Sequence, residues 1–166
     1  MDATRRSELA ATKNITSVER KSDREVVVTR SFDAPARLVF EAWSKPELFK
    51  RWWVPKSMGM TLRSCEMDVR TGGSYRLGFG DGMEFFGRYL EVTPPSRIVW
   101  TNEEGEENGS VTTVTLTETD GKTLLVVSEL FPSKEALDAD GGGAADAMHE
   151  TFEQLDELLV ELAARS

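Results

Sequence analysis

The chain has very few of the residues that build cross-links and metal sites. Cys65 is the only cysteine among 166 residues, which excludes an intrachain disulfide and a cysteine-based zinc site. His149 is the only histidine, and no partner at metal-ligand or catalytic-triad spacing accompanies it, so we expect a surface position. Gly72-Gly73 joins two predicted strands and opens no helix, which excludes a phosphate loop. The sequence therefore predicts no bound metal and no other cofactor.

Basic residues and long apolar runs are also scarce. The net charge of −9 argues against nucleic acid and anionic membrane surfaces as partners, because both attract clustered Lys and Arg. No run of about 18 apolar residues is present, so we expect no membrane insertion. No apolar run of the kind that a secretory signal needs follows Arg5 and Arg6, and the cytoplasm is the expected compartment.

The composition that remains is that of a globular protein. Hydrophobic residues make up 39% of the chain and charged residues 30%, and 166 residues suffice for one domain with a substantial core. Residues 1–23 are polar with few large apolar groups, which predicts a flexible arm with a short helix around Ser7 to Ala11. Residues 24–166 form the predicted single domain.

Three helices are predicted, two short and one long. Asp33 and Pro35 follow the first predicted strand, at 25–32, and mark a helix start, because aspartate caps helices and proline suits their first turn. Pro46 starts a second short helix that ends before Pro55. The long helix is predicted at 144–164, where apolar residues recur at spacings of four and three: Met148, Phe152, Leu155, Leu159 and Leu162.

Six further strands are predicted between these helices, at 60–69, 75–79, 83–93, 97–102, 111–119 and 122–130. Asp81-Gly82 and Asp120-Gly121 are dipeptides typical of tight hairpins. Pro94-Pro95 ends a strand, because proline donates no hydrogen bond to a ladder. Residues 131–143 are predicted as irregular, since three consecutive glycines make a fixed conformation costly in entropy.

These elements predict an α+β fold. A helix is about 10 Å wide, too narrow to cover about seven strands spaced about 4.8 Å apart. We therefore expect a curved antiparallel sheet of about seven strands wrapped around the long C-terminal helix, with the two short helices closing one end. A sheet curled around a helix tends to leave a space, which either forms a cavity or is filled by side chains.

The order of these elements, with several short motifs, resembles the helix-grip superfamily called START-like or SRPBCC. Within it, the chain is similar to the group related to the C-terminal domain of the heat-shock-protein 90 ATPase activator. The similarity covers about residues 24 to 164, and each motif is weak alone whereas the ordered set is specific. The motifs are Thr29 to Pro35, Phe40 to Trp43, Pro46-Glu47, Arg51 to Pro55, Asp68 to Gly73, Gly87 to Val92, Pro94 to Val99 and Met148 to Leu155.

This resemblance implies a hydrophobic cavity between the sheet and the long helix. Members of the superfamily bind lipids, polyketides, hormones or other apolar molecules, and some are cyclases or dehydratases. Co-chaperone activity transfers poorly, because the activator has a separate N-terminal domain where this chain has a short polar arm. The motifs therefore indicate the fold and leave the ligand open.

Glu129 is the candidate for acid–base chemistry. It alternates with Leu125 and Val127, so it shares their face of the strand. If that face points inward, burial would raise the pKa of the carboxyl group and suit it to a general acid or base. The alternative is a glutamate at the rim of the cavity, solvated or paired with an arginine.

Aromatic residues are the candidates for ligand contact. The four tryptophans could stack on an aromatic ligand or pack in the core, while Tyr75 and Tyr89 could donate hydrogen bonds to a ligand or lie at the rim. Trp100 alternates with Ile98 and is expected to face the core. The predicted ligand-binding set is Trp43, Trp53, Tyr75, Phe79, Phe85, Trp100, Glu129, Met148 and Phe152.

Three functions remain open on the sequence alone. The first is binding of a small apolar or aromatic ligand, such as a lipid or polyketide, between the sheet and the C-terminal helix. The second is an enzyme of cyclase, aromatase or hydrolase type that uses Glu129 as acid or base. The third is a protein-interaction module with a chaperone as partner. Because a fold hosts many functions, the site must decide among them.

Overall fold

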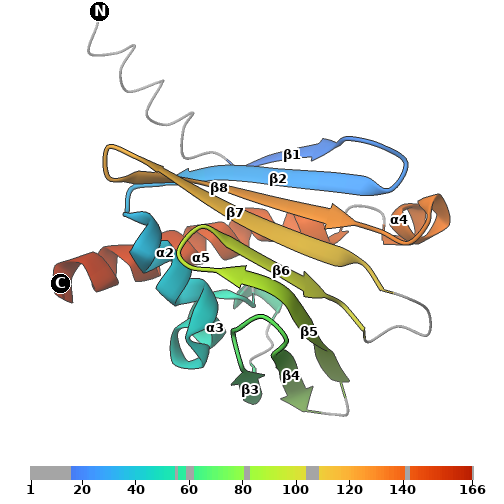
Figure 1. The fold of residues 1–166 in the computed structure, drawn as a ribbon, viewed down its shortest axis with the longest axis horizontal. Helices are drawn as coiled ribbons and strands as arrows, with labels where there is room; N and C mark the ends of the chain where they lie inside the picture. Colours follow the sequence, from blue (N-terminus) through green and yellow to red (C-terminus); the bar gives the residue numbers. More distant parts are fainter. Residues whose placement is uncertain are drawn as a thin grey trace, which may run out of the picture.

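An antiparallel β-sheet is the framework of the protein (Figure 1). The computed structural model describes residues 16–54, 56–58, 62–80, 83–103, 109–140 and 143–165. Within these ranges eight strands pair in the order β1-β2-β8-β7-β6-β5-β4-β3, each antiparallel to its neighbours. Their bounds are β1 (Ser17–Arg20), β2 (Glu25–Phe32), β3 (Ser64–Met67), β4 (Ser74–Gly80), β5 (Met83–Thr93), β6 (Arg97–Thr101), β7 (Val111–Thr119) and β8 (Lys122–Leu130).

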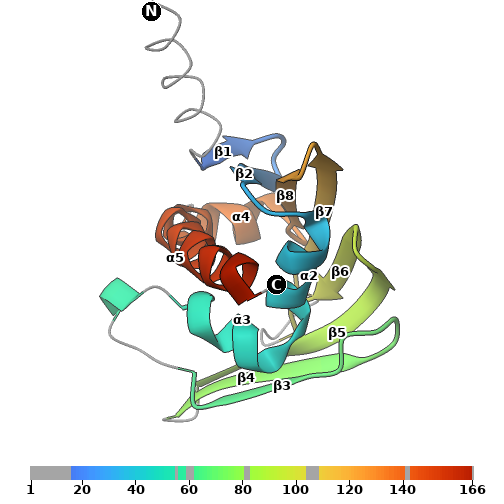
Figure 2. The ribbon, with the colours of Figure 1, turned by 90° about the vertical axis from the view of Figure 1, so that its left-hand side faces the viewer.

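The sheet curves around the helices, as the view in Figure 2 shows. The long helix α5 (Gly143–Arg165) lies within the curve, and α2 (Ala36–Ser44) and α3 (Pro46–Trp52) lie beside it. A 3-10 turn, η1 (Lys56–Met58), follows α3, and the short helix α4 (Lys134–Asp140) precedes α5. This arrangement confirms the predicted α+β helix-grip fold. No helix in the described ranges is long and apolar enough to cross a membrane.

The core forms where α5 meets the inner face of the sheet. Four residues of the predicted apolar stripe on α5 are buried: Phe152, Leu155, Leu159 and Leu162. Met148, the fifth, is partly buried against the same core. From the sheet, Phe32 of β2 packs edge-on against Phe152, with 5.7 Å between the ring centroids. Each fully buried side chain of this size contributes about 1.5–3 kcal/mol, so the stripe is a main source of stability.

The predicted strand boundaries hold where turn residues mark them. Asp120 and Gly121 join β7 to β8 with φ values of 53° and 78°, the left-handed region that a two-residue hairpin turn of this kind uses. β5 ends at Thr93, directly before Pro94-Pro95. The hairpin predicted at residues 81–82 lies outside the described residues. β3 is shorter than the strand predicted at 60–69, part of which also lies outside them.

The strand order corrects the prediction of about seven strands. β1 lies in the segment predicted as a flexible arm, and it pairs with β2 from Ser17 opposite Thr29 to Arg20 opposite Val26. All four side chains of β1 are exposed, so the backbone ladder holds the strand and no apolar alternation reveals it in the sequence. The helix predicted around residues 7–11 lies outside the described residues.

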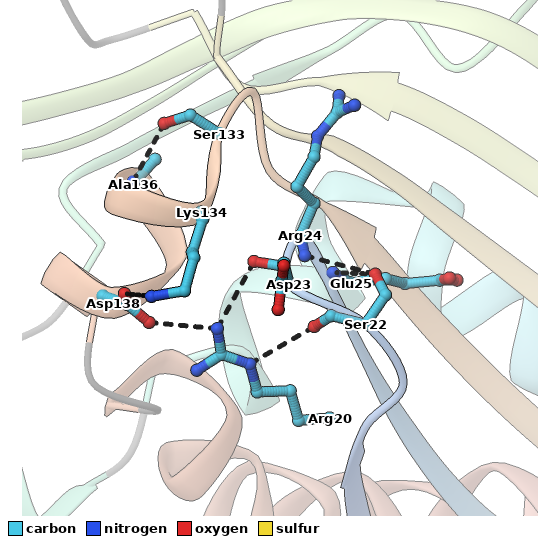
Figure 3. Close-up of polar contacts among 9 residues, drawn as sticks. All are labelled: Arg20, Ser22, Asp23, Arg24, Glu25, Ser133, Lys134, Ala136 and Asp138. Carbon is cyan, nitrogen blue, oxygen red and sulfur yellow. Dashed lines mark hydrogen bonds and ion pairs between the residues drawn. The ribbon is translucent and has the colours of Figure 1, made fainter.

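A second correction concerns residues 131–143, predicted as irregular, where helix α4 forms. Ser133 accepts a hydrogen bond from the Ala136 amide at 3.1 Å, which is the arrangement of a helix N-cap. Asp138 on α4 forms ion pairs with two basic side chains, Lys134 at 2.7 Å and Arg20 of β1 at 3.0 Å (Figure 3). These contacts hold α4 beside the turn between β1 and β2.

The start of α2 also differs from the prediction. The residue at the N-cap position is Pro35 rather than Asp33. A side-chain oxygen reaches the helix end from across the fold, because Glu118 of β7 accepts a hydrogen bond from the Ala36 amide at 2.8 Å. Glu118 lies 82 residues further along the chain, so no local sequence pattern could reveal this contact.

Candidate functional site

A row of side chains crosses the inner face of the sheet from β5 to β2. Tyr89 lies opposite Trp100, Trp100 opposite Thr112, Thr112 opposite Glu129, and Glu129 opposite Val26. Directly opposite residues of antiparallel strands point to the same face, so these five side chains form one line, which we call the cross-sheet row. Glu129 is half-buried and the other four are buried. The row thus brings together two predicted site residues, Trp100 and Glu129.

Tyr75 of β4 reaches the row across a glycine. It lies opposite Gly87 of β5, and its hydroxyl donates to the carbonyl oxygen of Thr101 on β6 at 2.8 Å. A Cβ atom on Gly87 would lie 1.9 Å from that same oxygen, so glycine leaves the room that this contact needs. The rings of Tyr75 and Tyr89 lie 5.7 Å apart. A second phenol therefore stands beside the row.

A chain of hydrogen bonds links Tyr75 to Glu129. The Tyr75 hydroxyl lies 3.2 Å from Asn102 Oδ1, and Asn102 Nδ2 donates to the hydroxyls of Ser110 and Thr112, at 3.0 Å each. Ser110 in turn donates to the Glu129 carboxylate at 2.6 Å. Two residues that the sequence singled out are thus joined through Asn102 and Ser110, with Thr112 bonded to Asn102 as a branch; we call these five residues the polar chain.

The three missed residues give unequal signals in the sequence. Asn102 ends a predicted strand and Ser110 lies in a predicted loop, and no motif marks either, although the Asn102 amide donates to the Ser110 carbonyl at 2.9 Å. Thr112 alternates with the buried Val114, so its inward direction follows from strand periodicity. Periodicity could therefore have found one of the three.

Aromatic rings from α2 and the end of α3 lie against the row. The ring of Trp43 is central, with its centroid 5.8 Å from Trp100, 4.8 Å from Trp52 and 5.6 Å from Trp53. Phe49 stacks on Trp53 at 4.8 Å. Trp43 and Trp52 are buried and Trp53 is half-buried. Ring pairs of this kind contribute about 0.5–1.5 kcal/mol each beyond the area that they bury, so the cluster is well held.

The polar atoms on these rings differ in their partners. Trp52 Nε1 donates to the carbonyl of Ala42 at 2.9 Å. Trp43 Nε1, in contrast, is buried and has no hydrogen-bond partner. The Tyr89 hydroxyl likewise makes no hydrogen bond with the described residues, although the side chain is only 5% exposed. Burial raises the pKa of the Tyr89 phenol, so it remains a neutral donor at physiological pH.

A hydrogen-bonded latch ties the segment after α3 to helix α5. Gln154 of α5 donates to the carbonyls of Trp52 at 3.0 Å and Val54 at 2.9 Å. Its side-chain oxygen accepts from the amide of Lys56 at 2.8 Å. One buried amide group therefore fixes the backbone on both sides of Trp53.

Two neighbours of Gln154 extend the latch. Thr151 donates to the carbonyl of Trp53 at 3.3 Å. Glu150 accepts hydrogen bonds from the hydroxyl and the amide of Ser57, at 2.5 and 2.9 Å. These bonds lower the pKa of Glu150, because they favour the charged carboxylate. The motif from Met148 to Leu155 on α5 thus positions the segment that carries Trp53.

The other predicted ligand-binding residues lie in three places. Phe152 packs in the core, 6.5 Å from the Trp52 ring, and Met148 lies on the same helix at the edge of that core. Phe79 and Phe85 form an edge-to-face pair of their own on β4 and β5, with 5.4 Å between centroids. Phe85 is exposed and Phe79 is half-buried. In the described part of the chain, no ring contact joins this pair to Trp100.

The described ranges contain no group of side chains suited to bind a metal ion. No cluster of three or more His, Cys, Asp or Glu side chains there is arranged to hold an ion. His149 is exposed, as predicted. Burial raises the pKa of the Cys65 thiol to about 11, and its sulfur lies 3.4 Å from the sulfur of Met67. Such a thiol is a weak nucleophile at neutral pH.

Solved structures with the same fold come from several bacteria. A protein from Rhodobacter sphaeroides has a TM-score of 0.77 at 23% identity, covering 89% of this chain and 99% of its own. A protein from Nitrosomonas europaea has a TM-score of 0.74 at 25% identity, covering 87% and 99%. A protein from Staphylococcus epidermidis has a TM-score of 0.71 at 26% identity, covering 87% and 94%. These likenesses concern the fold.

The family assignment comes from the sequence profile of one protein family. No curated protein matches the chain. The profile of the family described as Activator of Hsp90 ATPase homolog 1-like protein matches residues 33–160. This range runs from the start of α2 almost to the end of α5, and it includes every strand from β3 to β8. The chain therefore belongs to the family of Activator of Hsp90 ATPase homolog 1-like proteins.

Proposed function

We propose that the protein binds a small apolar or aromatic molecule, such as a lipid or polyketide, between the cross-sheet row and the helices α2, α3 and α5. The observation that supports this proposal is the placement of Tyr89, Trp100 and Glu129 in one line across the inner face. Small-molecule sites combine apolar and aromatic walls with a few fixed polar groups, and the row has this composition.

The two parts of the site have separate tasks. The rings of Trp43, Trp53 and Trp100 supply apolar area, which is the main source of affinity for an apolar ligand. The polar chain from Tyr75 to Glu129 supplies a rigid edge, because each of its members is held by another. A ligand held by the first part is oriented by the second.

Native mass spectrometry with a broad panel of lipids and aromatic polyketides tests this function. We expect saturable uptake of at least one compound at one molecule per chain. Thr112→Leu, which adds bulk to the row, should abolish uptake. Thr113→Leu is the matched control, because the neighbouring residue points to the outer face. No saturable uptake across the panel, or equal uptake by the two folded variants, would count against the proposal.

A catalytic use of the same site is a second candidate. It is favoured by the Glu129 carboxylate, which is half-buried at the end of the polar chain. A general acid or base in this position could move a proton to or from a bound molecule. Once a substrate is known, turnover by the Glu129→Gln variant tests the role, because unchanged turnover removes it.

A chaperone partner is a third candidate, and the family match supports it. The family takes its description from an activator of the Hsp90 ATPase. A pull-down with Hsp90, followed by an ATPase assay, tests the interaction directly. Absence of both binding and stimulation would exclude it.

A further inference from the structure

We propose that the molecule bound at this site carries a neutral oxygen acceptor, such as a ketone or ether oxygen, to which Trp43 and Tyr89 donate hydrogen bonds. This inference rests on the proposed function, since it concerns the chemistry of the same ligand. It makes Trp43 and Tyr89 the residues that select oxygenated aromatic molecules over plain hydrocarbons.

The first observation is the indole nitrogen of Trp43. The side chain is 2% exposed, and Nε1 has no hydrogen-bond partner. A buried donor without a partner costs free energy, and native proteins rarely leave one unmatched. Trp52 shows that the same cluster can satisfy an indole internally, because its Nε1 donates to Ala42 at 2.9 Å. The unmatched donor on Trp43 is therefore specific to that position.

The second observation is the contrast between the two phenols. The Tyr75 hydroxyl is committed, since it lies 2.8 Å from the Thr101 carbonyl and 3.2 Å from Asn102 Oδ1. The Tyr89 hydroxyl, whose ring is 5.7 Å away, bonds to no described residue. Of two adjacent phenols on the inner face, one supports the structure and the other keeps a free donor.

The two side chains that carry these donors neighbour the same residue, Trp100. Trp43 contacts Trp100 with 5.8 Å between ring centroids, and Tyr89 lies directly opposite Trp100 on the next strand. A flat ligand that lies against Trp100 would thus have hydrogen-bond donors of the protein nearby. Such a ligand would need to supply only the acceptor. The complement of neutral donors between aromatic walls is an acceptor oxygen on an apolar body.

Charge favours a neutral oxygen over a carboxylate. Glu129 lies two positions from Trp100 in the cross-sheet row, and the chain as a whole carries a net charge of −9. An anionic ligand would bring a second carboxyl group close to Glu129, in a poorly solvated place of a chain that is already strongly negative. A ketone or ether accepts the same hydrogen bonds without this penalty.

A pair of probes that differ in one oxygen tests the inference. 9-Fluorenone and fluorene have the same planar skeleton, and only fluorenone has a carbonyl. We expect the wild-type protein to bind fluorenone about tenfold tighter or more, since a hydrogen bond to the unmatched buried donor of Trp43 is at stake. Fluorene-9-carboxylate, the anionic probe, should bind more weakly than fluorenone. Isothermal titration calorimetry measures all three affinities.

Two variants assign the selectivity to its residues. Tyr89→Phe removes the free hydroxyl and should lower the ratio of fluorenone to fluorene affinity several-fold. Tyr75→Phe removes a committed hydroxyl, so it should weaken both probes together and keep their ratio. Trp43 is followed without mutation, because its indole N–H resonance in the wild-type NMR spectrum should shift downfield with fluorenone and much less with fluorene.

The outcomes separate the two levels of the proposal. Equal binding of fluorenone and fluorene, with no selective shift of the Trp43 resonance, would leave the proposed function intact and overturn this inference. The indole N–H would then be facing a neighbouring ring, and Trp52 and Trp53 stand nearly edge-on to it at 69° and 66°. Binding of no probe would overturn this inference, whereas only the lack of uptake across the whole mass-spectrometry panel would overturn the proposed function.

Discussion

The hydroxyl of Ser110 donates a 2.6 Å hydrogen bond to the carboxylate of Glu129, and this contact closes the polar chain at the edge of the inner face. The same hydroxyl accepts a hydrogen bond from Asn102 Nδ2 at 3.0 Å, so it connects Asn102, directly after β6, to Glu129 on β8. Glu129 thus has two roles. Its hydrogen bond with Ser110 holds the strand ends together, and it supplies the only carboxylate in the cross-sheet row.

Substitution of Glu129 separates these two roles. Glu129→Gln keeps a side-chain oxygen that can accept from Ser110, so we expect the free energy of unfolding to change by about 1 kcal/mol or less. Glu129→Leu removes that acceptor and should cost about 1–3 kcal/mol. Urea denaturation followed by tryptophan fluorescence measures both. Equal losses for the two variants would show that the Ser110 contact contributes little.

The latch between α5 and the segment after α3 predicts a local effect. Gln154→Ala removes hydrogen bonds to the Val54 carbonyl and the Lys56 amide, as well as the one to Trp52. We expect the Lys56 amide to exchange its hydrogen about tenfold faster or more, because local opening needs less free energy. Glu153→Ala, at the exposed neighbouring position, is the control and should not change the exchange. Unchanged exchange in Gln154→Ala would mean that these hydrogen bonds do not hold the segment after α3.

Arg30 of β2 predicts an unusual order of stabilities. Its side chain is 5% exposed beneath α5, its Nη2 lies 3.3 Å from Asp156 Oδ2, and its Nε and Nη1 have no hydrogen-bond partner. Asp156 is 37% exposed, so its removal leaves only the buried guanidinium uncompensated, whereas an apolar replacement of a buried charge is often neutral or stabilising. We therefore expect Asp156→Ala to lose about 1–3 kcal/mol and Arg30→Met to lose less.

Chemical denaturation decides that order. Glu157→Ala, at an exposed position of the same helix, controls for the loss of a carboxylate and should change stability by less than about 0.5 kcal/mol. A greater loss in Arg30→Met than in Asp156→Ala would mean that the guanidinium stabilises the fold, for example through the Phe32 ring that it covers at 4.7 Å.

Cys65 gives a prediction for pH. Burial raises the pKa of its thiol to about 11, well above the ordinary value, so the folded protein holds the proton that the unfolded chain loses first. At pH 8 the thiolate fraction, and hence alkylation by iodoacetamide, should be about 100-fold lower in the folded protein than in urea. The difference should shrink as the pH rises from 9 to 11, and stability should fall over the same range.

Mass spectrometry reads this reaction without ambiguity, because Cys65 is the only cysteine. A folded protein that is alkylated at pH 8 as fast as the unfolded chain would contradict the protected environment.

Sequence patterns predicted most of the framework, because they depend on local rules. The hairpin at Asp120-Gly121 and the apolar stripe of α5 follow from backbone sterics and helical periodicity, and both are present. β1 gave no signal, because a ladder of backbone hydrogen bonds holds four exposed residues. α4 carried a signal in the Ser133 cap, which three following glycines obscured.

The site was harder to predict than the fold, because its contacts are long-range. Alternation indicated that Trp100 and Glu129 face inward, yet no local rule shows that Asn102 and Ser110 connect Glu129 to Tyr75. Nor does composition distinguish Trp52, whose nitrogen bonds to its own helix pair, from a tryptophan with a free donor. Such differences arise only when the elements pack.

The position of a bound molecule on the inner face is tested most directly by intermolecular nuclear Overhauser effects between 9-fluorenone and the isotope-labelled protein. We expect contacts from the fluorenone ring protons to the side chains of Trp100 and Tyr89, which share the cross-sheet row. Contacts only to outward-facing residues of β8, such as the exposed Leu124, would contradict binding at this site.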